Sequence, residues 1–278
     1  MSRRQTSIGQ WLLAGIVVLA AIAAGVFIWR KALHPDTQAA VPAASSSVAA
    51  AATTAQPAAA IQYPIAPAGP APADSSPVPM LDDSDTRVAE ALAALAGGDQ
   101  LRSLLLPEQI VRHLVATIDA LPRQGIATSI LPLRTPTGAF MVEQAGQATT
   151  ISARNAGRYA PYMQLVEHAD PPALVAWYVH YYPLFQQAYR ELGYPHGYFN
   201  DRLIAAIDDM LAAPMPGGPI ALTRGSTAYL FADPNLQSLS VGQRMLIRLG
   251  PDNETRVKAK LREIRALLVR RSISAATP

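Results

Sequence analysis

The chain lacks cysteine altogether and has very little lysine. Without cysteine it can form no disulfide bond, no thiolate metal site and no cysteine nucleophile. Lysine occurs only at Lys31, Lys258 and Lys260, which leaves little scope for Schiff-base chemistry. Aromatic residues make up only 6% of the chain, so a local concentration of them is informative.

Sequence motifs of common enzyme classes are also absent. The chain contains no phosphate-binding P-loop, no dinucleotide-binding glycine pattern, no paired-histidine zinc motif, no nucleophile elbow and no Ser-x-x-Lys pattern. These absences argue against a P-loop ATPase, a Rossmann oxidoreductase, a zinc peptidase, an α/β-hydrolase and a penicillin-binding enzyme. We therefore expect no cofactor, and a protein that is not an enzyme is the favoured interpretation.

A metal site is not expected either. The histidines after residue 80 have no helical metal-ligand spacing, and a set built from Glu167, His168 and Asp170 would need three near neighbours to converge on one ion. The acidic residues from Asp82 to Asp85 lack the alternation and the later glutamate of a calcium loop. We expect them to cap a helix and to interact with its dipole instead.

An uncharged apolar run extends from about residue 8 to residue 29 between basic residues. A helix of this length is about 33 Å long, enough to cross a bilayer. Trp11 and Trp29 fit the interfaces near its ends. A cleavable signal peptide is the alternative, but the run is longer than a usual signal core and no clear cleavage site follows it. We predict that residues 1–31 are a cytoplasmic tail and a single transmembrane anchor, with residues 8–29 in the lipid bilayer.

Residues 32–80 are rich in alanine and proline and contain no lysine or arginine. They show no apolar periodicity, so we predict an extended, disordered linker. A long stretch without positive charge is typical of a translocated segment. We therefore expect a single-pass inner-membrane protein with a cytoplasmic amino terminus and a periplasmic carboxy-terminal domain.

Residues 81–272 carry the periodic apolar residues of one compact helical domain, and a disordered tail is expected at 273–278. Residues 139–151 and 219–231 lack a helical period and predict one hairpin each. The expected fold class is mainly α with two small β-hairpins. This domain should follow the transmembrane helix and the disordered linker.

The domain should be organised around two apolar helices, at about residues 171–192 and 200–214. Asp170 before two prolines is typical of a helix start, Asn200 can cap the second helix, and Gly193 fits a carboxy-terminal cap. Apolar and aromatic residues form two adjacent stripes on the first helix, which is too wide an apolar surface for a helix with a solvated side. Pro183 predicts a kink or a break in it.

Most of the aromatic residues lie between Tyr159 and Phe199. A groove of tyrosines can stack on sugar rings or hold a peptide. The simpler interpretation, which the helical spacing favours, is that the rings are core and the hydroxyls reach the surface. The candidate ligand-binding residues of this segment are Tyr178, Tyr182, Arg190, Tyr194, His196, Tyr198 and Asp201.

These features favour a binding or scaffold protein of the cell envelope, with the bilayer and either peptidoglycan or an envelope protein as partners. One alternative is an enzyme that cleaves cell-wall glycan, with Glu167 or Glu191 as the acid beside the aromatic cleft. Another is an accessory protein of transport or secretion. The basic face of the helix expected at 253–271 is a weak nucleic-acid signal without a motif, so no nucleic acid is expected as a partner.

Several sequence blocks resemble a known family. They are YPLFQQAYRELGYP at 182–195, YFNDRLIAAIDDMLAAP at 198–214 and FADPNLQSLSVGQRMLIRLGP at 231–251, with LDDSD at 81–85 and VATIDALP at 115–122 similar to the family's opening blocks. The family is a proteobacterial one known only as a domain of unknown function, numbered three thousand and fourteen in its series. The resemblance implies one domain in the cell envelope behind an anchor and a low-complexity spacer. It implies no activity and no catalytic residues.

The predicted topology can be tested with reporters fused after Pro278. A reporter that is active only in the periplasm should be active in this fusion, because the charge pattern places the domain there. Activity of a reporter that works only in the cytoplasm would contradict the prediction.

Overall fold

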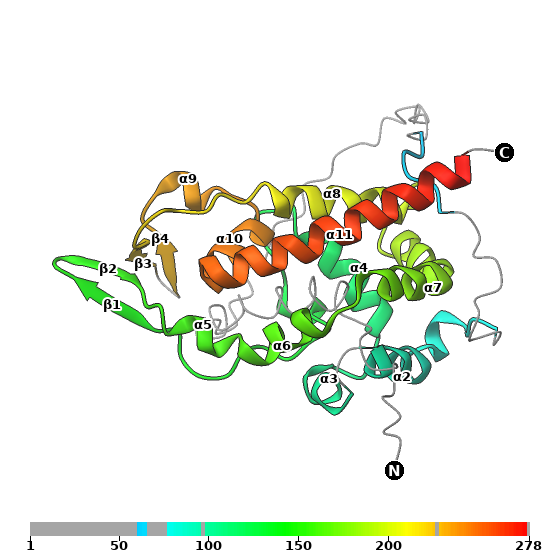
Figure 1. Cartoon of the computed structure of the whole chain (residues 1–278), viewed down its shortest axis with the longest axis horizontal. Coiled ribbons are helices and arrows are strands. Elements are labelled where there is room, and N and C mark those ends of the chain that lie inside the picture. The colour runs from blue at the N-terminus through cyan, green and yellow to red at the C-terminus, as the bar shows by residue number, and fades with distance from the viewer. Residues whose placement is uncertain (1–59, 66–76, 96–97, 226–227, 277–278) are drawn as a thin grey trace, which may run out of the picture.

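The computed structural model describes residues 60–65, 77–95, 98–225 and 228–276. It is mainly helical, with a small antiparallel sheet at one end (Figure 1). The α-helices are α2 (Asp85–Leu95), α3 (Asp99–Leu104), α4 (Ile110–Ala120), α5 (Asn155–Arg158), α6 (Ala160–His168), α7 (Pro171–Glu191), α8 (Phe199–Leu211), α9 (Pro234–Gln237), α10 (Val241–Leu249) and α11 (Pro251–Ala276). The remaining elements are the 3-10 turns η2 (Leu81–Asp83) and η3 (Thr128–Ile130) and the strands β1 (Val142–Ala145), β2 (Ala148–Ile151), β3 (Ala221–Arg224) and β4 (Tyr229–Phe231).

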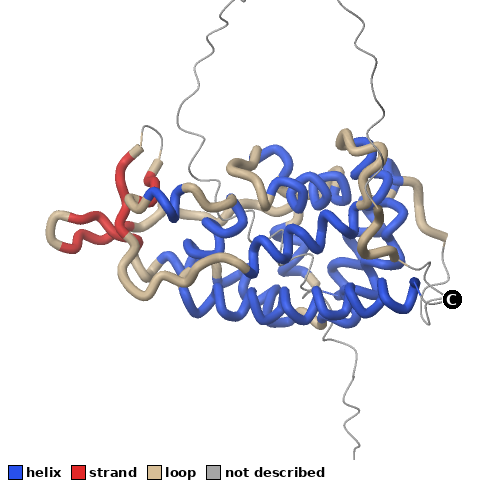
Figure 2. Tube along the Cα trace, turned by 90° about the horizontal axis from the view of Figure 1, so that it is seen from above, coloured by secondary structure: helices blue, strands red, loops and turns tan. Residues whose placement is uncertain are grey.

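Helix α7 is the centre of the helical body. Helices α4, α8 and α11 all pack against it, and Figure 2 shows the helices gathered into one body with the strands at its end. Its buried side chains lie on more than one face and include Leu174, Tyr178, Leu184 and Phe185. Because such a helix has little polar surface to present to water, it is stable only where neighbouring helices cover it.

Aromatic rings fill the space between α7 and α8. The rings of Phe185 and Phe199 stack with their centroids 5.7 Å apart. The edge contacts of Phe185 with Trp177 and Tyr178 have centroid distances of 5.7 Å and 5.3 Å. Such pairs contribute about 0.5–1.5 kcal/mol each beyond the burial of their area. These rings form core, as their helical spacing predicts.

Helix α7 begins and ends close to where the sequence predicts. Asp170 occupies the position before the helix, although its side chain makes no capping hydrogen bond. Gly193 follows the helix with a φ of 114°, a conformation that favours glycine at a helix end. Of the kink or break predicted at Pro183, the break is absent, because α7 continues through this residue. Pro183 lies on the exposed side, where water can satisfy the carbonyl that lacks its amide partner.

The strands form one sheet in the order β1-β2-β3-β4, with every pair antiparallel. The prediction of two hairpins is thus correct for the local pairs, but wrong in leaving them separate. Thr149 and Thr150 of β2 lie opposite Leu222 and Ala221 of β3. A two-stranded hairpin is marginally stable alone. Joining the hairpins gives them a shared buried face against Ile247 of α10.

The chain turns from α10 into α11 at Gly250, whose φ is 88°. Ser240 caps α10: its hydroxyl accepts a hydrogen bond from the Gln243 amide at 3.1 Å, and the Gln243 side-chain oxygen accepts one from the Ser240 amide. Helix α11 starts at a proline, which suits a first helical turn. It is longer than the predicted 253–271, and residues 273–276 of the predicted tail are helical.

The acidic cluster from Asp82 to Asp85 caps a helix, although not α2, which begins at Asp85 itself. The Asp85 carboxylate accepts hydrogen bonds from the backbone amides of Gln109 at 2.6 Å and Ile110 at 2.8 Å, at the start of α4. Asp82 forms an ion pair with Arg112 of α4 at 2.7 Å. The cluster therefore fastens the beginning of the domain to α4.

The predicted anchor at residues 1–31 and most of the predicted linker at 32–80 lie outside the described residues. None of the described helices combines the length and the apolar character that a membrane crossing requires. Residues 60–65 and 77–80 belong to the predicted linker, and side chains from both stretches pack against the core of the domain.

The central position of α7 predicts a large effect of Phe185→Ala, because Phe185 is fully buried. We expect a loss of about 3–5 kcal/mol in the free energy of unfolding, measured by urea denaturation. Gln187→Ala, on the exposed side of the same helix, should change it by no more than about 0.5 kcal/mol. Similar losses for the two variants would contradict the central role of α7.

Candidate functional site

Four of the predicted ligand-binding residues, Tyr178, Tyr182, Tyr198 and Asp201, come together around the amino end of α8. The ring centroids of Tyr178 and Tyr182 are 5.7 Å apart, and those of Tyr182 and Tyr198 are 5.6 Å apart. Tyr178 is fully buried, whereas the other two rings are half-buried. The rings thus form a row from the core to the surface, beside the Asp201 carboxylate.

Residues 60–65 of the same chain lie across this row as a segment without helix or strand structure. Figure 1 shows them as the short blue stretch near the far end of α11. The two carboxylate oxygens of Asp201 accept hydrogen bonds from the backbone amides of Tyr63 at 2.8 Å and Gln62 at 3.0 Å. Hydrogen bonds to an ionised carboxylate are among the stronger ones in proteins.

Further along the segment, the Tyr198 hydroxyl accepts a hydrogen bond from the Ile65 amide at 2.6 Å. The Asn200 side chain donates to the Tyr63 carbonyl at 2.9 Å. Pro64 has no amide hydrogen and needs no acceptor. The domain therefore binds the main chain of this segment on either side of Pro64, which has no amide hydrogen to donate.

The side chains of the segment add apolar and polar contacts. Tyr63 and Ile65 are half-buried against the main hydrophobic core. The pKa of Arg265 on α11 is raised, first by its hydrogen bond with Asp208 and also by the nearby Tyr63 side chain. The segment therefore spans the side of the body formed by α8 and α11.

The loop before α8 is fixed by Gln186 of α7. Its side chain donates to the Gly197 carbonyl at 2.8 Å and accepts from the Phe199 amide at 2.9 Å. It also accepts a hydrogen bond from the Tyr182 hydroxyl at 2.9 Å. A Cβ at Gly197 would lie 2.7 Å from the Tyr189 ring, so this position requires glycine. These contacts determine where Tyr198 and Asp201 lie.

A second polar cluster surrounds Asp119 of α4, which is 4% exposed. Arg202 of α8 donates to its carboxylate at 2.9 Å. Arg123 donates to the same carboxylate and to the Tyr194 hydroxyl. The Tyr194 ring stacks on Tyr189 with a centroid distance of 4.5 Å. Tyr194, a predicted ligand-binding residue, is thus part of the contact between α4 and α8.

The remaining predicted residues, Arg190 and His196, are exposed and lie outside the contacts that hold residues 60–65. Sequence reasoning missed Gln186, and it assigned Asn200 the wrong role. The structure gives Asn200 no capping bond. Its side chain is fully buried and links the Tyr178 hydroxyl, at 3.2 Å, to the segment. Asn200 lies two residues after Tyr198 in the sequence, and this proximity was the available signal.

The hydroxyls of Tyr178 and Tyr182 act as fixed hydrogen-bond donors. Burial raises the pKa of Tyr178 well above its ordinary value. Burial is also the main reason that the pKa of Tyr182 is raised, and the hydrogen bond with Tyr198 adds to the effect. Both hydroxyls therefore keep their protons at neutral pH, which suits structural support rather than proton transfer.

The two glutamates considered as glycosidase acids lie on the surface. Glu167 forms an ion pair with Arg256 at 2.6 Å, and Glu191 forms one with Arg112 at 2.9 Å. Both carboxylates are exposed, and neither contacts the row of tyrosines through the bonds described above. The described residues contain no cluster of potential metal ligands.

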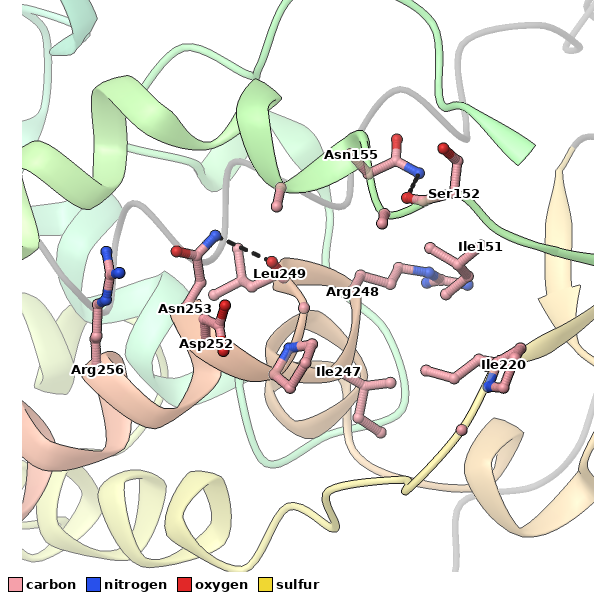
Figure 3. Close-up of a pocket in the computed structure, with 16 residues that line it drawn as sticks. Ile151, Ser152, Asn155, Ile220, Ile247, Arg248, Leu249, Asp252, Asn253 and Arg256 are labelled. Atoms are coloured by element: carbon pink, nitrogen blue, oxygen red, sulfur yellow. Dashed lines mark hydrogen bonds between the residues drawn. The ribbon is translucent and has the colours of Figure 1, made fainter. Parts of the chain in front are cut away.

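Two adjoining cavities lie at the other end of the body, next to the sheet. Their volumes are about 410 Å³ and about 390 Å³, and they share Gly218, Ile220, Ile247 and Pro251 in their walls. Figure 3 shows the larger one, into which the Arg248 side chain extends from α10. No residue in its wall belongs to the set predicted from the sequence.

Comparison with known proteins gives one match. A family model for a protein of unknown function, DUF3014, matches residues 110–265. The matched region runs from α4 into α11 and contains α7, α8 and the sheet. Neither the curated proteins nor the solved structures contain a match to the chain.

The Asp119 cluster predicts that Arg202→Ala destabilises the domain by about 3 kcal/mol, because the variant leaves a buried carboxylate with one guanidinium fewer. Arg256→Ala breaks the surface ion pair with Glu167 and should cost less than about 1 kcal/mol. Urea denaturation measures both. Equal effects would show that the Asp119 cluster does not fix α8 against α4.

Proposed function

The chain belongs to the DUF3014 family of proteins of unknown function, and we propose that it is a peptide-binding protein, anchored in the inner membrane, whose domain faces the periplasm. Its ligand is an extended segment of an envelope protein that binds at the amino end of α8. The protein performs no catalysis at this site.

The observation that carries the proposal is the binding of residues 60–65 through their main chain. Three backbone amides and one carbonyl of this segment pair with side chains of Tyr198, Asn200 and Asp201. Main-chain recognition of this kind gives affinity for many extended sequences, while pockets for side chains give selectivity. The half-buried Tyr63 and Ile65 favour a ligand with an aromatic residue, a proline and an aliphatic residue in that order.

The same geometry favours a peptide over a glycan. Sugar recognition by stacking needs exposed aromatic faces. Tyr178 and Tyr189 are buried, and the half-buried Tyr182 contacts the rings of Tyr178 and Tyr198 on either side. A protein segment is therefore the better candidate than the sugar chains of peptidoglycan.

The proposed location rests on the sequence. The apolar run at residues 8–29 is long enough for a membrane anchor, and the linker that follows carries no positive charge. An anchored domain on a long linker can reach partners at some distance from the bilayer. Such a position suits a module that recruits or holds other envelope proteins.

The test uses the full chain with residues 61–65 replaced by glycine and serine, so that the site is vacant. An acetylated and amidated peptide of residues 60–65 should bind this variant saturably in a calorimetric or fluorescence titration. The unchanged protein should bind it at least about tenfold more weakly, because the tethered segment competes at an effective concentration near millimolar.

Two controls separate recognition of the backbone from apolar adhesion. A peptide with N-methyl groups on Tyr63 and Ile65 keeps every side chain but lacks two of the three amide donors, and it should not bind. Asp201→Ala in the vacant protein should also abolish binding. The proposal is wrong if the methylated peptide binds as well as the parent, or if neither peptide binds.

A further inference from the structure

The two edges of the sheet differ in how their outward main-chain groups are used. In the order β1-β2-β3-β4, strand β4 forms one edge and strand β1 forms the other. The amides and carbonyls on the outer side of an edge strand can pair with a further strand, unless other groups of the protein occupy them. The partners of these groups therefore decide whether another strand can join the sheet.

The edge at β4 is closed by side chains of the same domain. Because the Ala232 amide donates to β3, the alternation of an antiparallel ladder turns the main-chain groups of Tyr229 and Phe231 outward. The Phe231 amide donates to the side-chain oxygen of Gln237 at 3.0 Å. The Tyr229 carbonyl accepts a hydrogen bond from Arg248 at 3.2 Å. A further strand would have to displace both side chains.

The edge at β1 is open. The Ser152 amide donates to the Met141 carbonyl at 3.2 Å, so the main chain of Met141 faces the side of β2. The same alternation turns the amides and carbonyls of Val142 and Gln144 away from β2. Outside the pairing of β1 with β2, no hydrogen bond within the described part of the chain involves these four groups. They can therefore accept a further strand without the loss of an existing bond.

The open edge is also accessible. Figure 1 shows the hairpin of β1 and β2 extending beyond the helices. Glu143 is the charged residue of β1, and its carboxylate accepts a hydrogen bond from the Ser152 hydroxyl of its own hairpin at 2.5 Å. Strand β1 contains no proline, the residue that most directly prevents pairing at an edge.

Strand β1 is complementary to a second copy of itself in one antiparallel register. When Val142 lies opposite Val142 of the second copy, the two valines exchange both of their main-chain hydrogen bonds, and Gln144 pairs with Phe140. Glu143 then lies opposite Met141, so no two like charges meet. The two valine side chains become neighbours on the face that Val142 and Phe140 share with the small apolar cluster of the sheet.

The neighbouring registers are less favourable. A register centred on Glu143 places the two carboxylates directly opposite each other, which is destabilising. A register centred on Met141 places Gln144 opposite Gly138, whose φ of 81° takes the chain out of the extended conformation. The register centred on Val142 therefore uses the outward groups of β1 most completely.

We propose that two copies of this chain associate through β1, in an antiparallel pairing centred on Val142, so that their sheets join into one continuous sheet. A two-fold axis then passes through this residue pair, as in other interfaces that use the same surface of both subunits. This interface is independent of the site at α8.

The test is cysteine cross-linking of the full-length protein in detergent, because the chain has no cysteine of its own. In the proposed register the two Cα atoms at position 142 lie about 5.5 Å apart, within the range of about 4.4–6.8 Å that a disulfide bridges. Under mild oxidation, Val142→Cys should therefore form a disulfide-linked dimer.

Two matched variants control for register and for random collision. Gln144→Cys places the two cysteines four residues out of line, about 13 Å apart along the strand. Ala148→Cys introduces an exposed cysteine on β2, behind the edge. Both should cross-link at least about tenfold more slowly than Val142→Cys, because their Cα atoms are too far apart for a disulfide. Faster cross-linking of Gln144→Cys than of Val142→Cys would contradict the proposed pairing.

A second experiment tests the outward amide of Val142. Chains with Met141→Cys and chains with Glu143→Cys are mixed, since these positions face each other across the proposed interface, and they should cross-link. Val142→Pro in both chains removes the outward amide but no bond of the β1–β2 pairing, so it should abolish the cross-link. Val142→Ala keeps the amide and should preserve the cross-link. Thermal unfolding checks that the Val142→Pro chains remain folded.

The proposal fails if Val142→Cys cross-links no faster than Ala148→Cys. In that case the edge is unpaired or receives a strand of another protein. It also fails if folded Val142→Pro chains cross-link as well as the chains with valine.

Discussion

The burial of helix α7 is the constraint on which the rest of the structure depends. Apolar side chains cover more of this helix than a partly solvated helix can carry, so α4, α8 and α11 must enclose it. Its rings interlock with Phe199 from α8, which fixes the angle and position at which the second helix meets the first. Helices α4 and α11 pack against both α7 and α8, whereas the sheet lies at the other end of the body against α10.

The same constraint produces the site at α8. Tyrosines in a core need partners for their hydroxyls. Those of Tyr178 and Tyr182 find them in Asn200 and Gln186, at the boundary between α7 and α8. The side-chain amide of Asn200 also binds residues 60–65, and that of Gln186 binds the loop that carries Tyr198. Because the side chains of Tyr178, Gln186 and Asn200 are buried, the loop and the helix end that carry Tyr198 and Asp201 are held in one position.

The features of the fold that depend on residues close together in the sequence were predictable from sequence patterns. Helical spacing located α7 and α8 and indicated that the tyrosine rings are core. Contacts between distant residues were not predictable in this way. The pairing of β2 with β3 joins segments about seventy residues apart. Asp85 resembles a cap for the next helix, yet it caps α4.

The position of residues 60–65 in the structure is a further feature that the sequence alone could not predict. Residues 60–65 lie in a stretch whose alanine and proline content is typical of a solvated linker, and no periodicity distinguishes them. Their position is determined by acceptors on Tyr198 and Asp201, more than 130 residues away. Four residues predicted from the sequence as ligand-binding lie at this position, but nothing in the sequence indicated that a segment of the same chain packs there.

Amide hydrogen exchange in the full-length protein tests this account most directly. The account predicts that the amides of Tyr63 and Ile65 exchange more slowly than in the isolated peptide, because both are bonded to the domain. The Tyr198 hydroxyl accepts from the Ile65 amide and not from the Tyr63 amide. Tyr198→Phe keeps the ring but removes this acceptor, so it should accelerate exchange at Ile65 far more than at Tyr63. Exchange of both amides at the rate of the free peptide would show that the segment does not occupy the site.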